Sequence, residues 1–319
     1  MKWLAIINPR ANHHSREDLE RLSETLHRHL GADCHWTPCP NQTTDIVRRN
    51  QHYDGFIAVG GDGTVEEVVN GMAIPRHYLG IIPAGTGNGL ARDLQIHNEE
   101  QAVRVLCQSR FRPLDLVEVR FRQGNSWRHL RRMISVSGLG YVEGVTEIGI
   151  RPSKRLGFWF YVFTAIVQSF RQKKFAARVR FDEGDWQQFT LKNLVVQNTQ
   201  NVGSFRLFPE ARLDDGKFNV LYGQLGPGLQ LIEDLAIVSQ TYFCEWSERR
   251  QAEKLEVELP QPRALMIDGE LFDGVDAVHY RIVKKGLWCC TPNPNGGLSA
   301  GSDDLAAIAK TATEPESPQ

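Results

Sequence analysis

Short apolar runs alternate with segments of helical periodicity in the N-terminal third of the chain. Residues 3–7 form a continuous apolar run that ends in Asn-Pro, which is typical of a buried strand. Leu19, Leu22, Leu26 and Leu30 follow at spacings of 3, 4 and 4 residues, which predicts one face of an amphipathic helix.

Two further apolar runs, at residues 56–59 and 79–82, predict buried strands, and residues 65–72 predict the beginning of a helix. Asn98, with Gln101 three residues later, resembles a capping box at the start of another helix. Because strands that alternate with helices pair in parallel, this part of the chain predicts an open α/β sheet.

The pattern changes after about residue 113 to short segments rich in Val, Ile, Phe or Tyr. Many of them alternate polar and apolar residues, as in antiparallel sheets with one solvated face. The segments are 116–121, 133–136, 177–181, 194–197, 218–222, 255–259, 278–283 and 287–290, with helical stretches near 155–173 and 227–240.

We therefore expect an α/β protein with two domains. An N-terminal open α/β domain covers residues 1–120, and a mainly antiparallel β domain covers residues 121–292. Residues 293–319 contain mostly small and polar residues, which predicts a disordered tail.

Composition narrows the class of protein. Lys and Arg total 37 and Asp and Glu total 38, so the net charge of −1 argues against a dedicated nucleic-acid binder. The six cysteines include no C-x-x-C pair, and we interpret them as reduced thiols of a cytoplasmic protein. The N-terminus does not resemble a signal peptide, and the longest nearly uncharged run, 156–170, is too short to span a bilayer.

The strongest chemical signal is the segment Gly60-Gly61-Asp62-Gly63-Thr64, which leads from a predicted strand directly into a predicted helix. The free N–H groups and positive dipole of a helix N-terminus bind phosphate, and glycines let the backbone approach it. Asp62 could hold Mg²⁺, or water bound to the metal, beside that phosphate. The alternative is a plain strand-to-helix turn.

A second glycine turn, residues 84–89, follows the strand predicted at 79–82. Two such loops at the ends of neighbouring strands would form one crevice, where open α/β sheets bind ligands. The lysine of a Walker P-loop is absent, so backbone amides and a metal must balance the charge of the phosphates.

Together, GGDGTVEEVVNG and PAGTGNGLARDL resemble the diacylglycerol kinase catalytic domain of the wider lipid kinase family, especially its soluble bacterial members. The resemblance continues in Asn8-Pro9, in residues 137–141, in residues 208–211 with 214–217, and in residues 267–270. It implies an ATP-binding domain like that of NAD kinases, a β-rich lipid domain, and a cleft between them. The implied reaction transfers the γ-phosphoryl group of ATP to a lipid hydroxyl, with diacylglycerol as the first expectation.

The resemblance also implies roles for individual residues. Glu270 would accept the proton of the lipid hydroxyl; Asp62 is the other candidate base, and Asp268 could simply shape an Asp-Gly turn. Mg²⁺ would bind the Asp215 carboxylate and the backbone carbonyls of Arg212 and Lys217. The implied ATP contacts are Asn8, Thr37, Gly61, Asp62, Gly63, Thr64, Val65, Glu66, Glu67 and Thr86.

Two departures leave the acceptor lipid open. Glu66 stands where many bacterial members carry Asn, and Gly89 replaces an Asp that is common in diacylglycerol kinases. Small residues at the latter position also occur in sphingoid-base and ceramide kinases. The other readings are an NAD kinase, against which the second glycine loop argues, and a lipid-binding protein without catalysis, against which the intact acidic residues argue.

One segment suggests contact with a membrane surface. Residues 156–167 are apolar and aromatic, with basic residues on both sides, as in helices that dock at the inner face of a membrane. A core helix that packs on the β domain would have a similar composition. A helix that does both, with one face lining a lipid slot, fits a lipid kinase best, so we expect transient, peripheral membrane association.

Overall fold

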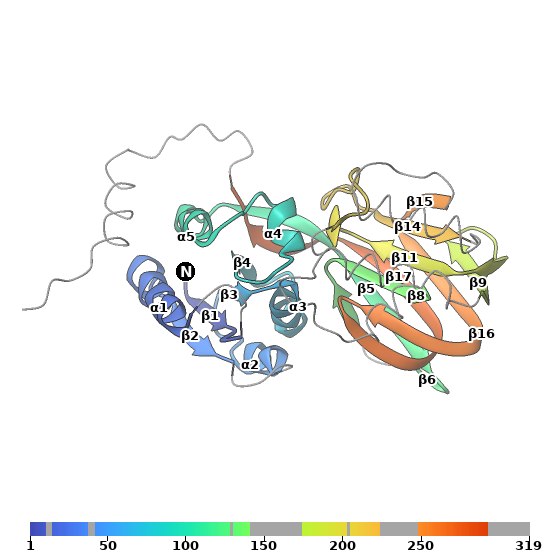
Figure 1. Ribbon diagram of the computed structural model, residues 1–319, viewed down its shortest axis with the longest axis horizontal. Helices are drawn as coiled ribbons and strands as arrows, with labels where there is room; N and C mark the ends of the chain where they lie inside the picture. Colours follow the sequence, from blue (N-terminus) through green and yellow to red (C-terminus); the bar gives the residue numbers. More distant parts are fainter. Residues whose placement is uncertain are drawn as a thin grey trace, which may run out of the picture.

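A computed structural model describes most of the two predicted domains (Figure 1). The described residues are 1–10, 15–37, 42–127, 130–140, 174–202, 205–223 and 248–292. The helices predicted near 155–173 and 227–240, the segment 156–167 and the tail 293–319 lie outside the described residues.

The N-terminal part is an open α/β sheet, as predicted. Its strands are β1 (Trp3–Ile7), β2 (Asp33–Trp36), β3 (Gly55–Gly60) and β4 (Tyr78–Pro83), which pair in parallel in the order β4-β3-β1-β2. Its helices are α1 (Arg16–Leu30), α2 (Thr43–Arg49), α3 (Asp62–Gly71), α4 (Gly89–Asp93) and α5 (Glu99–Gln108). Helix α1 packs with α5 and α2 packs with α3, and Figure 1 shows the sheet between these pairs.

The predicted helix cap at Asn98 is confirmed. Its side chain accepts a hydrogen bond from the backbone N–H of Gln101 at 2.8 Å, as expected at a helix start. The Gln101 side chain accepts the N–H of His97 at 2.9 Å, one residue before the position that a complete capping box requires.

The second part is mainly antiparallel, as predicted. Within it, every strand pairing of the described residues is antiparallel. The strands are β5 (Phe111–Gln123), β6 (Ser126–Trp127), β7 (Arg131–Met133), β8 (Val136–Gly140), β9 (Phe175–Phe181), β10 (Gln187–Leu191), β11 (Asn193–Gln197), β12 (Asn201–Val202), β13 (Phe205–Arg206), β14 (Phe218–Gly223), β15 (Glu248–Ala252), β16 (Lys254–Ile267) and β17 (Glu270–Cys290).

One long strand joins the two parts. The segments predicted as separate strands at 278–283 and 287–290 belong to β17, whose register against β5 shifts between Val283 and Leu287. The end of β17 pairs in parallel with β4, and Leu287 is buried in the core of the α/β part. The division at residues 120 and 121 remains a prediction, and β17 runs through both cores.

Two further observations concern the cysteines and the helices. The described cysteines, Cys34, Cys107, Cys289 and Cys290, are all free thiols. Across the described ranges, no helix has both the length and the apolar character needed to cross a membrane.

Candidate active site

The two glycine loops meet at one edge of the sheet. Strands β3 and β4 are parallel neighbours, so the turns that follow them emerge side by side. A Cβ atom on Gly85 would lie 2.4 Å from the Cα of Gly61, closer than any side chain allows. Glycine at position 85 is therefore required for the loops to touch, which supports the predicted single crevice.

Asp62 connects the first loop to the second. The backbone N–H groups of Gly89, Leu90 and Asn88, at the start of α4, lie toward its carboxylate and favour its charged form. Burial raises the pKa of Asp62, while these donors oppose the shift. The N-terminus of α4 thus holds a carboxylate of the protein, which leaves the N-terminus of α3 as the candidate phosphate site.

The predicted nucleotide contacts from β1 and β2 lie close to that site. The side-chain amide of Asn8, directly after β1, donates to the Thr64 hydroxyl in the first turn of α3 at 3.1 Å. Thr37, directly after β2, donates its backbone N–H to the Ile7 carbonyl at 2.9 Å and is buried. Gly61, Gly63 and Val65 belong to the same turn as Thr64, whereas Thr86 lies exposed in the second loop.

Glu67 has a clear structural role. Its carboxylate accepts the backbone N–H of Thr43 at 3.1 Å, and its carbonyl accepts the Thr44 hydroxyl at 2.9 Å. The N-cap residue of α2, Gln42, makes no side-chain cap, so Glu67 supplies one from the neighbouring helix. A contact between Glu67 and ATP remains a prediction.

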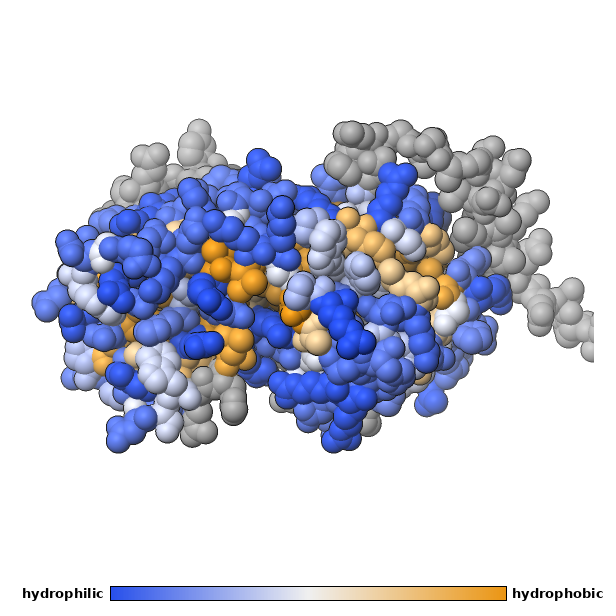
Figure 2. Space-filling model, turned by 180° about the vertical axis from the view of Figure 1, so that it is seen from behind, coloured by the Kyte–Doolittle hydropathy of each residue, from blue (hydrophilic) through white to orange (hydrophobic). Residues whose placement is uncertain are grey.

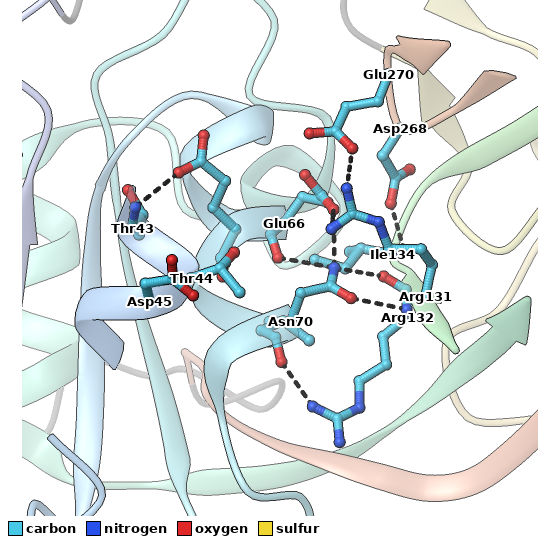
Figure 3. A network of polar contacts seen from close by, with 12 residues as sticks. Thr43, Thr44, Asp45, Glu66, Asn70, Arg131, Arg132, Ile134, Asp268 and Glu270 are labelled. Atoms are coloured by element: carbon cyan, nitrogen blue, oxygen red, sulfur yellow. Dashed lines mark hydrogen bonds and ion pairs between the residues drawn. The ribbon is translucent and has the colours of Figure 1, made fainter. Parts of the chain in front are cut away.

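One face of α3 points toward the β-rich part. Asp62, Glu66 and Asn70 recur every four residues, which places them on the same side of a helix. The Asn70 amide donates to Glu66 Oε1 at 2.8 Å, and its Oδ1 accepts the backbone N–H of Arg132 at 2.9 Å (Figure 3). These bonds fasten the helix after the first glycine loop to β7.

The Asp-Gly pair forms the hairpin turn between β16 and β17. Asp268 and Gly269 both have positive φ, 46° and 95°, and Ile267 pairs with Glu270 across the turn. Two central residues with positive φ are typical of a type I′ turn, for which Asp-Gly is a preferred sequence. The turn-forming role considered for Asp268 is therefore confirmed.

Asp268 also explains a break that the sequence analysis did not predict. Its carboxylate accepts the backbone N–H groups of Ile134, Ser135 and Val136 at 2.8–2.9 Å. The single strand predicted at 133–136 is wrong, since β7 ends at Met133 and β8 begins at Val136. Three successive N–H groups that turn toward one carboxylate cannot also alternate between the two sides of a strand.

The predicted base, Glu270, faces α3 through an arginine that the sequence analysis missed. Arg131 forms an ion pair with Glu270, and its guanidinium also lies 3.8 Å from Glu66 Oε1 (Figure 3). The Arg131 Cζ lies 5.4 Å from the ring centroid of Phe272. No spacing signal indicated this residue, because it is separated from Glu270 by 139 positions in the chain.

The acidic groups of this site influence one another. Burial raises the pKa of Glu66 to about 8, the carboxylates of Asp268 and Glu270 add to the shift, and Arg131 opposes it. Burial raises the pKa of Asp268 to about 6 despite its three backbone donors. At neutral pH, Glu66 is therefore mostly protonated and does not compete with Glu270 for the positive charge of Arg131.

The predicted Mg²⁺ segment is a surface loop. Arg212, Asp215 and Lys217 are exposed, and Asp215 Oδ1 accepts the N–H of Lys217 at 3.1 Å. The buried Asp115 fixes this loop by accepting the N–H of Gly216 at 2.6 Å. One carboxylate and two backbone carbonyls form an all-oxygen donor set, which suits Mg²⁺ if water completes the shell. Within the part of the chain that the structure describes, no group of three acidic, His or Cys side chains forms a metal site.

Comparisons with known proteins agree with this arrangement. Residues 2–119 match the family model of the diacylglycerol kinase catalytic domain. The match covers this N-terminal part of the chain. The match contains both glycine loops and ends within β5, so the diacylglycerol kinase catalytic domain corresponds to the α/β part described above.

Similarity to whole proteins extends past this catalytic domain. A diacylglycerol kinase of Staphylococcus saprophyticus subsp. saprophyticus is 27% identical over 258 residues, which cover 79% of this chain and 81% of that protein. A diacylglycerol kinase of Bacillus subtilis (strain 168) is 26% identical over 246 residues, with 74% and 78% covered.

Solved structures show the same fold. A diacylglycerol kinase from Bacillus anthracis str. Sterne has a TM-score of 0.70 at 18% identity and covers 92% of this chain and 97% of its own. An NAD kinase from Archaeoglobus fulgidus, solved with ATP, has a TM-score of 0.50 at 12% identity, with 91% and 94% covered. The predicted fold, like that of diacylglycerol kinases and NAD kinases, is confirmed.

Proposed function

We propose that the protein is an ATP-dependent lipid kinase that transfers the γ-phosphoryl group of ATP to a lipid hydroxyl, with diacylglycerol as the preferred acceptor. The observation that carries the proposal is the position of Glu270, which faces the helix that begins at the GGDGT turn. A base and a phosphate-binding helix on opposite sides of one site suit transfer between two substrates. The family match and the relatives named diacylglycerol kinase support the same reaction.

The proposed mechanism begins with the ATP phosphates at the N-terminus of α3. Gly61 and Gly63 bring backbone N–H groups to the phosphates, and the dipole of α3 favours their negative charge. The lipid hydroxyl oxygen then forms a bond to the γ-phosphorus as the bond to the bridging oxygen of ADP breaks. Glu270 accepts the hydroxyl proton during this step.

We also propose that the protein binds Mg²⁺. Asp215 and the carbonyls of Arg212 and Lys217 would hold one ion, and Asp62 is the candidate partner for an ion at the phosphates. When bound at the phosphates, Mg²⁺ would neutralise charge on ATP. In the second part, the ion would fix the loop that follows Leu213, whose carbonyl accepts the N–H of Asp115.

A lipid acceptor also requires contact with a membrane surface. We propose that the protein works in the cytoplasm and visits the inner membrane face, where its acceptor resides. Figure 2 shows a face that is mostly hydrophilic at its margins and has apolar residues gathered toward its middle. Among the described residues, the exposed large apolar side chains are Met1, Trp127 and Leu130, and apolar side chains at a surface can contact acyl chains.

The direct test is a phosphoryl-transfer assay with γ-labelled ATP, Mg²⁺ and detergent micelles that contain diacylglycerol or sphingosine, with NAD in a separate reaction. Label in diacylglycerol is the expected result, and label in sphingosine would change the acceptor while keeping the reaction class. Label in NAD, or label in none of the three, would contradict the proposal. Glu270→Gln protein serves as the control for contaminating kinases.

A further inference from the structure

Arg131 has no role in the reaction described so far, although it contacts the proposed base. We propose that Arg131 is a positioning residue, which fixes the carboxylate of Glu270 relative to the helix that begins at the GGDGT turn. This inference rests on the proposed function. In this role, Arg131 on β7 aligns Glu270 with the nucleotide proposed to bind at the N-terminus of α3.

The guanidinium of Arg131 is held from three sides. It pairs with Glu270, approaches Glu66 Oε1 at 3.8 Å, and lies over the ring of Phe272. Glu270 and Phe272 are two residues apart on β17, so their side chains point to the same side of the strand. Phe272 packs in turn against Phe121, with ring centroids 4.7 Å apart, which limits its movement.

The neighbouring arginine has a different task. Arg132 donates from Nη1 to the carbonyl oxygens of Val69 and Met72 at 3.0 and 2.7 Å, at the C-terminal end of α3. The Val69 carbonyl also accepts the N–H of Met72 at 3.3 Å, so Arg132 adds a side-chain donor at this end of the helix and acts as a cap. Successive residues of a strand point to opposite sides. Strand β7 therefore places Arg132 against the end of α3 and Arg131 beside Glu270 in the site.

Strand β7 is therefore held in position by α3 as well as by the β-rich part. Asn70 bonds both the N–H and the carbonyl of Arg132, at 2.9 and 3.0 Å, and Arg132 itself caps the helix. A side chain that extends from β7 consequently keeps its place relative to the first glycine loop. Because Arg131 pairs with Glu270, it also fixes the position of this carboxylate, which lies on the hairpin at the opposite side of the site.

The expected consequence is a loss of orientation when Arg131 is removed. A Glu side chain has three rotatable bonds, and both Glu270 and Arg131 are half-buried, so solvent leaves the carboxylate room to turn away. Across the described ranges, no other side chain forms an ion pair with Glu270. A base displaced by about 1 Å can lower a rate by about 100-fold while the substrates still bind.

Three variants test the inference in the lipid kinase assay: Arg131→Gln, Arg131→Lys and the control Arg122→Gln. Arg122 is on the adjacent strand β5, pairs with Asp276 at 2.7 Å and has a comparable side-chain exposure. We expect Arg131→Gln to lower kcat by about 10- to 100-fold with an ATP Kd within twofold of wild type. Arg131→Lys should recover part of kcat, because it restores the charge, and Arg122→Gln should match wild type.

A double variant distinguishes positioning from a general structural effect. If Arg131 acts only through Glu270, Arg131→Gln combined with Glu270→Gln should have the same kcat as Glu270→Gln alone. Additive losses, or full kcat in Arg131→Gln, would overturn the inference while the proposed function stands. If the wild-type protein labels no lipid, the proposed function fails and the inference fails with it. Should Arg131→Gln not fold, Arg131→Lys takes its place: a kcat below wild type that falls no further than Glu270→Gln in the double variant supports the inference, and wild-type kcat or additive losses would overturn it.

Discussion

Gly61 and Gly85 touch backbone to backbone where the two glycine loops meet. A Cβ atom added to Gly85 would lie only 2.4 Å from the Cα of Gly61. A side chain at position 85 would push the two loops apart beside the turn into α3. The contact therefore links the geometry of the proposed phosphate site to the second loop, which also holds the Asp62 carboxylate.

Gly85→Ala should separate the loops and weaken ATP binding. The added methyl group would overlap backbone atoms, so we expect a loss of about 2–4 kcal/mol in the free energy of unfolding and at least a tenfold rise in the ATP Kd. Thermal unfolding and titration with ATP check both effects. Gly63→Ala is the stability control, because its Cβ would meet no atom within 4 Å. Equal melting temperatures for Gly85→Ala and wild type would contradict the described contact.

Glu66→Gln should change how stability depends on pH. The pKa of Glu66 is about 8 in the folded protein against 4.5 without its surroundings, so the folded state retains a proton that the unfolded state releases between these values. Stability of the wild type therefore falls as pH rises from 4.5 to 8, and the penalty is fully present above 8. Gln avoids this penalty and can still accept the Asn70 hydrogen bond.

Melting temperatures between pH 4 and 9 test this effect. We expect Glu66→Gln to be more stable than wild type at pH 9, by up to about 5 kcal/mol, with the difference shrinking toward pH 4.5. The neighbouring carboxyl groups of Asp268, Glu270 and Glu67 are present in both proteins. Glu100→Gln, at an exposed site on α5, is the control. Parallel pH curves for Glu66→Gln and wild type would show that Glu66 is not buried as described.

Asp215→Ala should remove a Mg²⁺-dependent stabilisation. A metal that binds only the folded state raises the melting temperature, and the stabilisation grows with the logarithm of one plus its concentration divided by its Kd. Without nucleotide, we expect added Mg²⁺ to raise the melting temperature of wild type by a few degrees and that of Asp215→Ala by less than one degree. The adjacent Asp214→Ala is the matched control, since Asp214 pairs with Arg112 at 2.5 Å and should keep the Mg²⁺ response. Equal shifts in Asp215→Ala and wild type would reject the site.

The sequence was most informative where structure is local. Runs of apolar residues and helical spacing predicted β1, α1, β3, α3 and β4, because these elements are set by which side chains face the core. The glycine loops were equally predictable, since a strand followed by glycines and a helix leaves few alternatives. Strand β2 and helix α2 were not predicted, because β2 is a short, half-exposed edge strand and α2 has only 7 residues.

Long-range polar contacts were not predictable in the same way. The partnership of Arg131 and Glu270 and the three N–H groups at Asp268 join segments more than 130 positions apart. The spacing of residues along the chain gives no sign of contacts between such distant segments. The repeat of Asp62, Glu66 and Asn70 at four-residue intervals was the one available signal, since it places three polar side chains on a single face of α3.

The central claim is that Glu270 accepts the proton of the lipid hydroxyl. Glu270→Gln keeps the shape of the side chain and a hydrogen-bond acceptor for Arg131 but cannot take up a proton at this step. The comparison with Asp62→Asn separates the two candidate bases, because loss of proton acceptance and loss of phosphate or metal handling affect different constants.

The most direct measurement is kcat for diacylglycerol phosphorylation by Glu270→Gln, with the ATP Kd and the melting temperature determined on the same preparation. We predict that kcat falls by roughly 100- to 10,000-fold, while the ATP Kd and the melting temperature stay close to wild type. A variant that retains most of its kcat and instead loses stability would contradict the claim and assign the proton transfer to another group, with Asp62 as the first to examine.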